Sequence, residues 1–216
     1  MRVSNEEIIE AFWETISMVS ISLLFAVIIG LPLGILLVVT RKGHLFENRF
    51  IFSILSTVVN IFRSIPFIIL MVAIVPLTRL LVGSSIGTAA AVVPLVFYSG
   101  PYIARLIENS LLEVDSGVIE AAEAMGATPF QIIFRFLIPE ALSSLILEIT
   151  IATIGLIGAS AMAGAVGGGG LGDLAITYGY QRFDTQVMVI TVVILILMVQ
   201  GMQTFGNILA KKIRRN

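Results

Sequence analysis

The residues of this chain that could do chemistry are few, and they exclude most kinds of catalysis. The 216 residues include no cysteine, which excludes disulfides, thiol catalysis and thiolate metal sites. His44 is the only histidine, so a Ser–His–Asp triad or a histidine-rich metal site lacks the groups it needs. No Gly-Lys pair occurs, and the G-x-x-x-x-G-K-[ST] loop that holds nucleotide phosphates is therefore missing. We expect no bond chemistry, no metal and no cofactor on this chain itself.

Two ionisable residues, Arg63 and Glu148, interrupt or border long apolar runs and are the leading functional candidates. An ionisable group inside a membrane span is costly and is a functional hypothesis by default. Arg63 has two interpretations: it is buried against helix carbonyls or an acidic partner, or it lines a cytoplasmic cavity. Glu148 lies about two helical turns into its run, where it could meet water and relay protons. Arg105 and Glu108, by contrast, are expected to form a solvated helical pair.

Small and flexible residues lie near the end of the fourth apolar run. Ser160 is small enough to allow close packing, and Met162 is flexible and apolar, as a core residue can be. The glycines at 167–172 match G-x-G-x-x-G, the pattern of dinucleotide sites, but no strand and helix flank them. They predict an exit turn outside the membrane, with a gating role as the alternative.

The elements that position these residues are predicted to be membrane-spanning helices. Of the residues, 57% are hydrophobic and only 12% are charged, and the mean hydropathy is +1.04; a soluble domain is about one-quarter charged. Each span needs about 20 mostly apolar residues, and continuous rather than alternating apolar runs favour helices over a barrel. The qualifying runs are 15–40, 50–78 with Arg63 as its only charge, 80–104, 149–172 with a helix that begins near Glu140, and 185–210. The predicted fold is an all-α integral membrane protein, with five transmembrane helices in one domain over residues 1–216.

Lysine and arginine are distributed unevenly around these runs, which predicts the orientation. The cations on one side are Arg41, Lys42, Arg49, Arg105, Arg135, Lys211, Lys212, Arg214 and Arg215, and those on the other side are Arg2, Arg79 and Arg182. The richer side should be the cytoplasm, so the N-terminus is expected outside and the C-terminus inside. The net charge of −1 gives no indication of nucleic-acid binding.

The longest cytoplasmic connection, residues 113–139, is predicted to hold two short helices. Asp115 can cap the first helix, and Gly126 can end it in the left-handed conformation. Thr128 and Gln131 form a capping box that starts the second helix. Such a pair either ties two spans together on the membrane surface or docks a cytoplasmic partner.

The same connection resembles the "EAA" motif of permeases from ATP-driven (ABC) importers. Glu120-Ala121-Ala122, then Gly126, then Ile138-Pro139 follow that motif, with Phe136 and Ile138 as apolar replacements of its Ile and Leu. In that family the loop is a coupling helix, which sits in a cleft of the ATPase subunit. The resemblance implies ATPase-coupling roles for Glu120, Ala121, Ala122, Gly126 and Ala127.

Longer stretches resemble the permeases of methionine ABC importers, and this similarity runs from Trp13-Glu14-Thr15 to the fifth apolar run. The stretches are 60–67 (NIFRSIPF), 125–129 (MGATP) and 160–172 (SAMAGAVGGGGLG). The resemblance implies a type I permease in the plasma (inner) membrane of a prokaryote. It also implies a second permease copy, two cytoplasmic ATPase subunits that hold ATP and Mg, and an extracytoplasmic substrate-binding protein. Substrate would then cross by alternating access. In such a pair the small Ser160 would permit close approach of the two subunits, and Met162 would either help to close the path near the dimer axis or pack in a core.

Two other functions and another substrate remain open at this point. An ion-coupled secondary transporter would use Glu148 and Arg63, but such carriers usually have internal repeats, and none is visible here. A membrane scaffold that transports nothing would not need a coupling motif. An ABC permease for another small substrate is a third possibility, because no residue identifies methionine by its chemistry.

Overall fold

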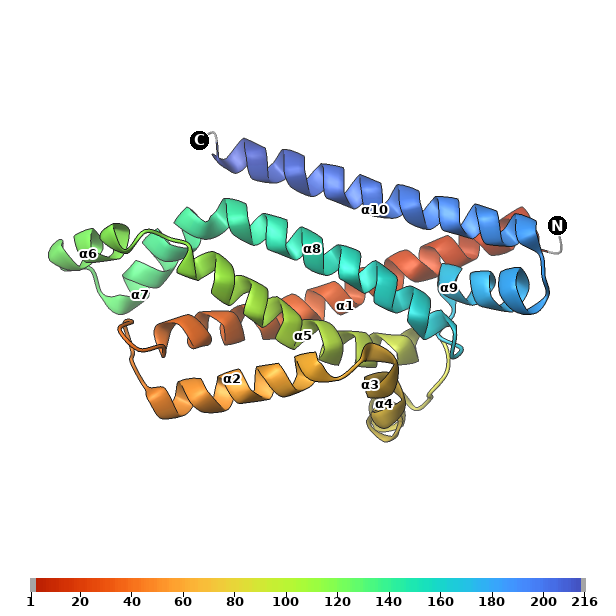
Figure 1. The fold of residues 1–216 in the computed structure, drawn as a ribbon, viewed down its shortest axis with the longest axis horizontal. Helices are drawn as coiled ribbons and strands as arrows, with labels where there is room; N and C mark the ends of the chain where they lie inside the picture. Colours follow the sequence, from red (N-terminus) through yellow and green to blue (C-terminus); the bar gives the residue numbers. More distant parts are fainter. Residues whose placement is uncertain (1–2, 215–216) are drawn as a thin grey trace.

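Long helices laid side by side along one axis make up the molecule (Figure 1). The structure is a computed structural model and describes residues 3–214. Among these residues, four helices are long and apolar enough to cross a membrane: α1 (Asn5–Val39), α5 (Thr88–Leu112), the segment that ends in α8 (Ile138–Gly164), and α10 (Thr185–Arg214). The expected all-α architecture is confirmed. Two cations used to predict the orientation, Arg2 and Arg215, lie outside the described residues, and the orientation itself stays a prediction.

The fifth expected span is broken rather than straight. Helix α2 (Arg49–Ser64) and α3 (Phe67–Ala73) together are apolar enough to span, but they meet at an angle of 101°. The break follows from Pro66, because proline disfavours a helical conformation in the preceding residue. Ile65 is accordingly extended, with φ −83° and ψ 122°. A further helix, α4 (Val75–Val82), ends at Gly83 with φ +80°.

The third expected run, 80–104, is placed too early. Its first residues belong to α4 and to a connector, and α5 begins at Thr88 and continues to Leu112. The charged residues Arg105 and Glu108 therefore lie inside the helix rather than beyond its end. The charge-free run indicated where this helix lies, but the helix continues past the run because its charged pair is buried.

Helices α1 and α5 pack closely because glycines of α1 remove the side chains between them. A Cβ atom on Gly30 would lie 2.9 Å from the carbonyl oxygen of Gly100, and one on Gly34 would lie 2.7 Å from that of Ala104. The glycine pair therefore packs against a helix of the same chain.

The segment between α5 and α8 folds back on itself at one end of the molecule (Figure 1). It consists of α6 (Ser116–Ala124), α7 (Pro129–Ile132) and a π-helical turn, η1 (Ile133–Leu137), which runs directly into α8. At the opposite end, α9 (Gly170–Leu174) and the π-helical turn η2 (Ala175–Gln181) turn back beside the end of α8. The two ends of the bundle thus carry different accessory elements.

Candidate coupling loop and translocation site

The predicted pair of short helices between α5 and α8 is confirmed, together with its caps. The Asp115 carboxylate accepts a hydrogen bond from the Gly117 N–H at 2.7 Å and begins α6. Gly126 has φ +77°, a conformation that favours glycine. Thr128 and Gln131 then exchange the two capping-box hydrogen bonds, at 2.8 Å and 3.4 Å, and begin α7. The local sequence therefore builds residues 113–139 into a rigid corner rather than a loose linker. This segment is called the corner below.

The tip of this corner exposes a carboxylate and also several apolar side chains. Glu120, Ala121 and Gly126 are exposed, and Ala127 is half-buried. Met125 is 71% exposed. Further along, Phe130 and Phe134 are also exposed. Apolar groups gathered on a protruding surface are typical of a protein–protein contact.

One residue of the motif faces the other way. Ala122 is fully buried, in a helix that packs on the turn η1 of its own chain. A larger side chain at this position would lift α6 away from η1. The contact of Ala122 with a partner stays a prediction, whereas its packing role is evident from the geometry.

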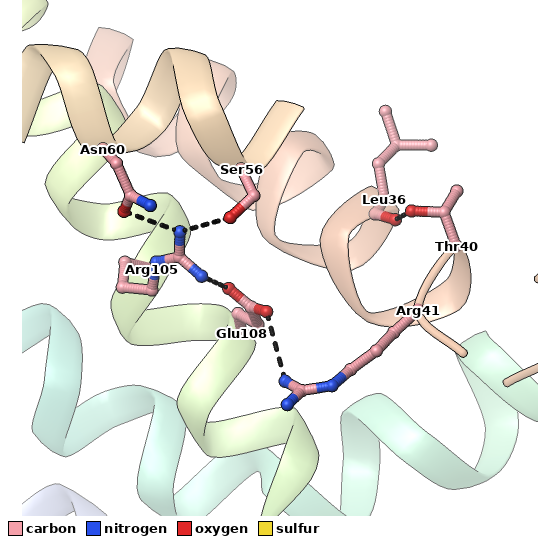
Figure 2. Close-up of polar contacts among 7 residues, drawn as sticks. All are labelled: Leu36, Thr40, Arg41, Ser56, Asn60, Arg105 and Glu108. Atoms are coloured by element: carbon pink, nitrogen blue, oxygen red, sulfur yellow. Dashed lines mark hydrogen bonds and ion pairs between the residues drawn. The ribbon is translucent and has the colours of Figure 1, made fainter. Parts of the chain in front are cut away.

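A buried ion network joins three helices near the same end of the bundle (Figure 2). The Glu108 carboxylate on α5 is 1% exposed; it accepts a hydrogen bond from Arg105 and lies 3.6 Å from the Arg41 guanidinium at the end of α1. Arg105 also donates to Ser56 Oγ at 3.1 Å and to Asn60 Oδ1 at 2.9 Å, both on α2. The expectation of a solvated pair is wrong, because α1 and α2 cover α5 here and exclude water.

The candidate residues for the translocation path lie on two helices, α2 and α8, and differ in their exposure. Arg63 is exposed near the end of α2, and Glu148 is half-buried on α8. Met162 is 54% exposed on α8. The Ser160 hydroxyl, two residues earlier, is buried and donates to the Ile157 carbonyl at 2.8 Å. A helix turns about 100° per residue, so Ser160 and Met162 point in different directions; a path-lining role for Ser160 stays a prediction.

The glycine turn at 167–170 is held by α1, a contact that sequence reasoning missed. Glu14 accepts from the Gly170 N–H at 2.7 Å, and Thr15 Oγ1 accepts from the Leu171 N–H at 2.9 Å. A Cβ atom on Gly170 would lie only 2.6 Å from Thr15 Oγ1. The predicted turn exists, but these residues are 156 positions apart, so no local pattern could reveal the clamp.

Comparison with known proteins settles the family. The sequence model of the binding-protein-dependent transport system inner membrane component matches residues 26–215. The chain belongs to this family. It is therefore a multi-pass inner-membrane component of a transport system, which agrees with the spanning helices and with the exposed corner.

Two similar sequences come from bacterial permeases. The probable D-methionine transport system permease protein MetI of Vibrio cholerae is 49% identical over 211 residues, 98% of this chain and 94% of that protein. The D-methionine transport system permease protein MetI of Escherichia coli K12 is 52% identical over 157 residues, 73% of this chain and 72% of that protein.

Solved structures give the same fold. The MetNI methionine ABC transporter, in an inward-facing conformation, has a chain 46% identical to this one, with a TM-score of 0.95 over 98% of this chain and 99% of that chain. An amino acid ABC transporter with histidines matches at 18% identity and a TM-score of 0.79, over 98% and 100% of the two chains, and this likeness concerns the fold alone. The type I ABC permease architecture expected from the motif is confirmed.

Proposed function

We propose that this chain is the permease subunit of an ATP-driven methionine importer. The observation that carries the proposal is the likeness to the MetNI methionine ABC transporter along 98% of the chain, with the coupling corner intact. In the proposed complex, two copies of the chain form the path, two ABC ATPase subunits bind ATP and Mg at the cytoplasmic face, and an extracytoplasmic protein delivers the substrate.

The exposed corner of α6 and α7 is the proposed contact with the ATPase. Its rigidity matters, because movement of the ATPase can reach the spans only if the corner moves as one body. Gly126 lets the chain turn sharply there, and η1 continues without a break into α8. Closure of the ATPases on ATP would therefore push on α8 directly and switch the path from inward-facing to outward-facing. By linkage, the free energy by which the ATP-closed state favours the loaded binding protein equals the free energy by which that protein favours the ATP-closed state.

The test is methionine uptake into proteoliposomes that contain this chain with its ATPase and binding protein. We expect uptake to require ATP, and we expect the Glu120→Lys variant to lose about tenfold or more of it, as about 1.4 kcal/mol of lost coupling would give. The reason is that Glu120 is exposed on α6, so a reversed charge meets the ATPase surface directly. ATP hydrolysis stimulated by the binding protein should fall in parallel.

The matched control is Lys42→Glu, a charge reversal at an exposed residue of the connector between α1 and α2, outside the corner. Uptake and hydrolysis should stay close to wild type in this control. Uptake driven by an ion gradient without ATP would instead favour a secondary transporter. An assembled, active ATPase complex that takes up another small molecule but no methionine would keep the permease function and reject the substrate.

A further inference from the structure

Helix α2 has two exposed faces of opposite character. Its polar residues, seen down the helix axis at 3.6 residues per turn, fall on one side; they are Arg49, Ser53, Ser56, Thr57, Asn60, Arg63 and Ser64. The other side exposes Phe50, Ile54, Val58 and Ile61 to the surroundings. In a membrane the apolar side suits lipid, and a row of polar groups needs water or polar partners.

Contacts on both sides of Arg63 fix its position against α5, which runs antiparallel to α2 (Figure 1). One turn before Arg63 on α2, Asn60 accepts a hydrogen bond from Arg105 at 2.9 Å. Just after Arg63 in the chain, at the start of α3, the Phe67 ring packs edge-on against Tyr98, with ring centroids 5.3 Å apart. Going one turn up α2 from Asn60 and one turn back along α5 from Arg105 brings Arg63 level with Tyr102.

Glu148 approaches the same tyrosine from α8. The Ser110 hydroxyl of α5 donates to Ser144 Oγ of α8 at 3.2 Å, which sets the register of this second antiparallel pair. One turn along α8 from Ser144, Glu148 lies about 5.4 Å further from the coupling corner, level with Leu106 and about one helical turn short of Tyr102. The charges of Arg63 and Glu148 both act on the Tyr102 phenol, and the Glu113 carboxylate is a further charge that acts on Glu148.

Neither charged group has a partner in the part of the chain that the structure describes. No ion pair or side-chain hydrogen bond of Arg63 or Glu148 occurs among residues 3–214. The buried Glu108, by contrast, is matched by two arginines. Two opposite and unmatched charges within about one helical turn of the same depth are costly unless water or a ligand meets them.

We propose that Arg63 and Glu148 form a binding site for a zwitterionic α-amino acid inside the translocation path. Arg63 takes the carboxylate, because the planar guanidinium can hold both carboxylate oxygens at once. Glu148 takes the ammonium group, and the Tyr102 hydroxyl, between them, can donate to the carboxylate. Arg63 and Glu148 together carry no net charge, and neither does the zwitterion, so occupancy keeps the site neutral and gives each of the two charges a partner. This inference rests on the proposed import function and deepens it.

The site predicts that uptake and ATP hydrolysis can be separated. Arg63→Gln and Glu148→Gln remove one charge each and leave the coupling corner untouched. In proteoliposomes with the ATPase and the binding protein, we expect methionine uptake to fall about tenfold in each variant, the effect of about 1.4 kcal/mol in binding. Hydrolysis stimulated by the loaded binding protein should persist, because the signal from outside still reaches the ATPase.

Matched controls come from the same two helices. Arg49→Gln changes an exposed arginine at the other end of α2, and Glu140→Gln changes an exposed glutamate two turns earlier on α8. Both controls should transport like the wild type. If Arg63→Gln and Glu148→Gln also transport like the wild type, the site is rejected. If the wild type itself shows no ATP-dependent methionine uptake, the proposed function fails instead, and the labelling experiment below then decides the site.

The absence of native cysteine allows a direct binding test without the binding protein. A Ser64→Cys variant places a single thiol on the polar face beside Arg63, and Ile61→Cys places one on the apolar face as the control. In the purified permease–ATPase complex, a charged methanethiosulfonate should modify the first variant and not the second. Methionine should slow this modification, whereas N-acetylmethionine, which lacks the ammonium group, should not.

Adding Arg63→Gln to the Ser64→Cys variant should abolish the protection by methionine. Equal modification on both faces would show that the polar face of α2 does not line a water-filled path. Unprotected modification at every concentration of methionine, and of alanine and leucine as further zwitterions, would overturn the site. Protection by alanine or leucine but not by methionine would keep the zwitterion site and reject methionine as its occupant.

Discussion

Replacing Gly172 with alanine should prevent α8 and α9 from packing, and we expect little folded permease to be recovered. An alanine Cβ at this position would lie 2.3 Å from the carbonyl oxygen and 2.5 Å from the Cα atom of Ala161. Both are backbone atoms, so no flexible side chain can move aside. Gly164, at the end of α8, faces α9 from the other side of the turn, and its Cβ would lie 2.3 Å from the backbone nitrogen of Asp173. The two segments therefore touch backbone to backbone.

The expected cost of Gly172→Ala is about 3 kcal/mol or more, at the upper end for overpacked sites. The measurement is the yield of monodisperse protein in detergent and its thermal unfolding midpoint. Gly201→Ala is the matched control, since a Cβ there meets nothing within 4 Å. That control should be neutral or slightly stabilising, because alanine favours a helix over glycine by about 1 kcal/mol. Equal midpoints for the two variants would contradict backbone contact between α8 and α9.

Glu108→Gln should destabilise the bundle by about 3–5 kcal/mol, the usual cost of removing one partner from a buried ion pair. The substitution keeps the shape of the side chain and removes its charge, so Arg105, whose side chain is only 17% exposed, stays buried without an anion (Figure 2). Most of the loss should come from this pair. Arg41 is 46% exposed, and water can replace its contact at little cost.

The measurement for Glu108→Gln is the unfolding midpoint of the purified chain in increasing dodecyl sulfate. Glu47→Gln serves as the control, because Glu47 pairs with Arg49 at 3.7 Å in an exposed position. An exposed pair of this kind contributes about 0–1 kcal/mol, so the control should unfold almost like the wild type. A Glu108→Gln midpoint equal to that of the control would show that the network adds nothing to stability.

Features that depend on neighbours in the sequence could be predicted without the structure. The spans at α1, α8 and α10 follow from the length and continuity of apolar runs, although α1 begins earlier than its run, at Asn5, and α8 ends earlier than its run, at Gly164. The corner at 113–139 follows from residues whose effect is local: Asp115, Gly126 and the Thr128 capping box. The "EAA" resemblance in the same corner identified the permease family, which the match over residues 26–215 confirms.

The sequence predicted the position of the break in the second span but not its angle. Ser64 and Pro66 mark where the helix must stop, because proline acts on the residue before it. Nothing local fixes the angle of 101° at which α3 leaves α2. That angle depends on the contact of Phe67 with Tyr98, which belongs to another helix.

Which face of each helix is buried was decided by tertiary structure alone. The sequence by itself placed Glu108 in a helix but not under α1 and α2, and it placed Ser160 and Met162 side by side although they point apart. The contact of Glu14 with Gly170 and the approach of Arg63 and Glu148 to within about one turn of Tyr102 likewise join residues far apart in the chain. Apolar composition and caps act over a few residues, so the sequence determined where the helices are. Burial and pairing of charges depend on which helices become neighbours, so only the packed bundle determined what those helices present to each other and to the path.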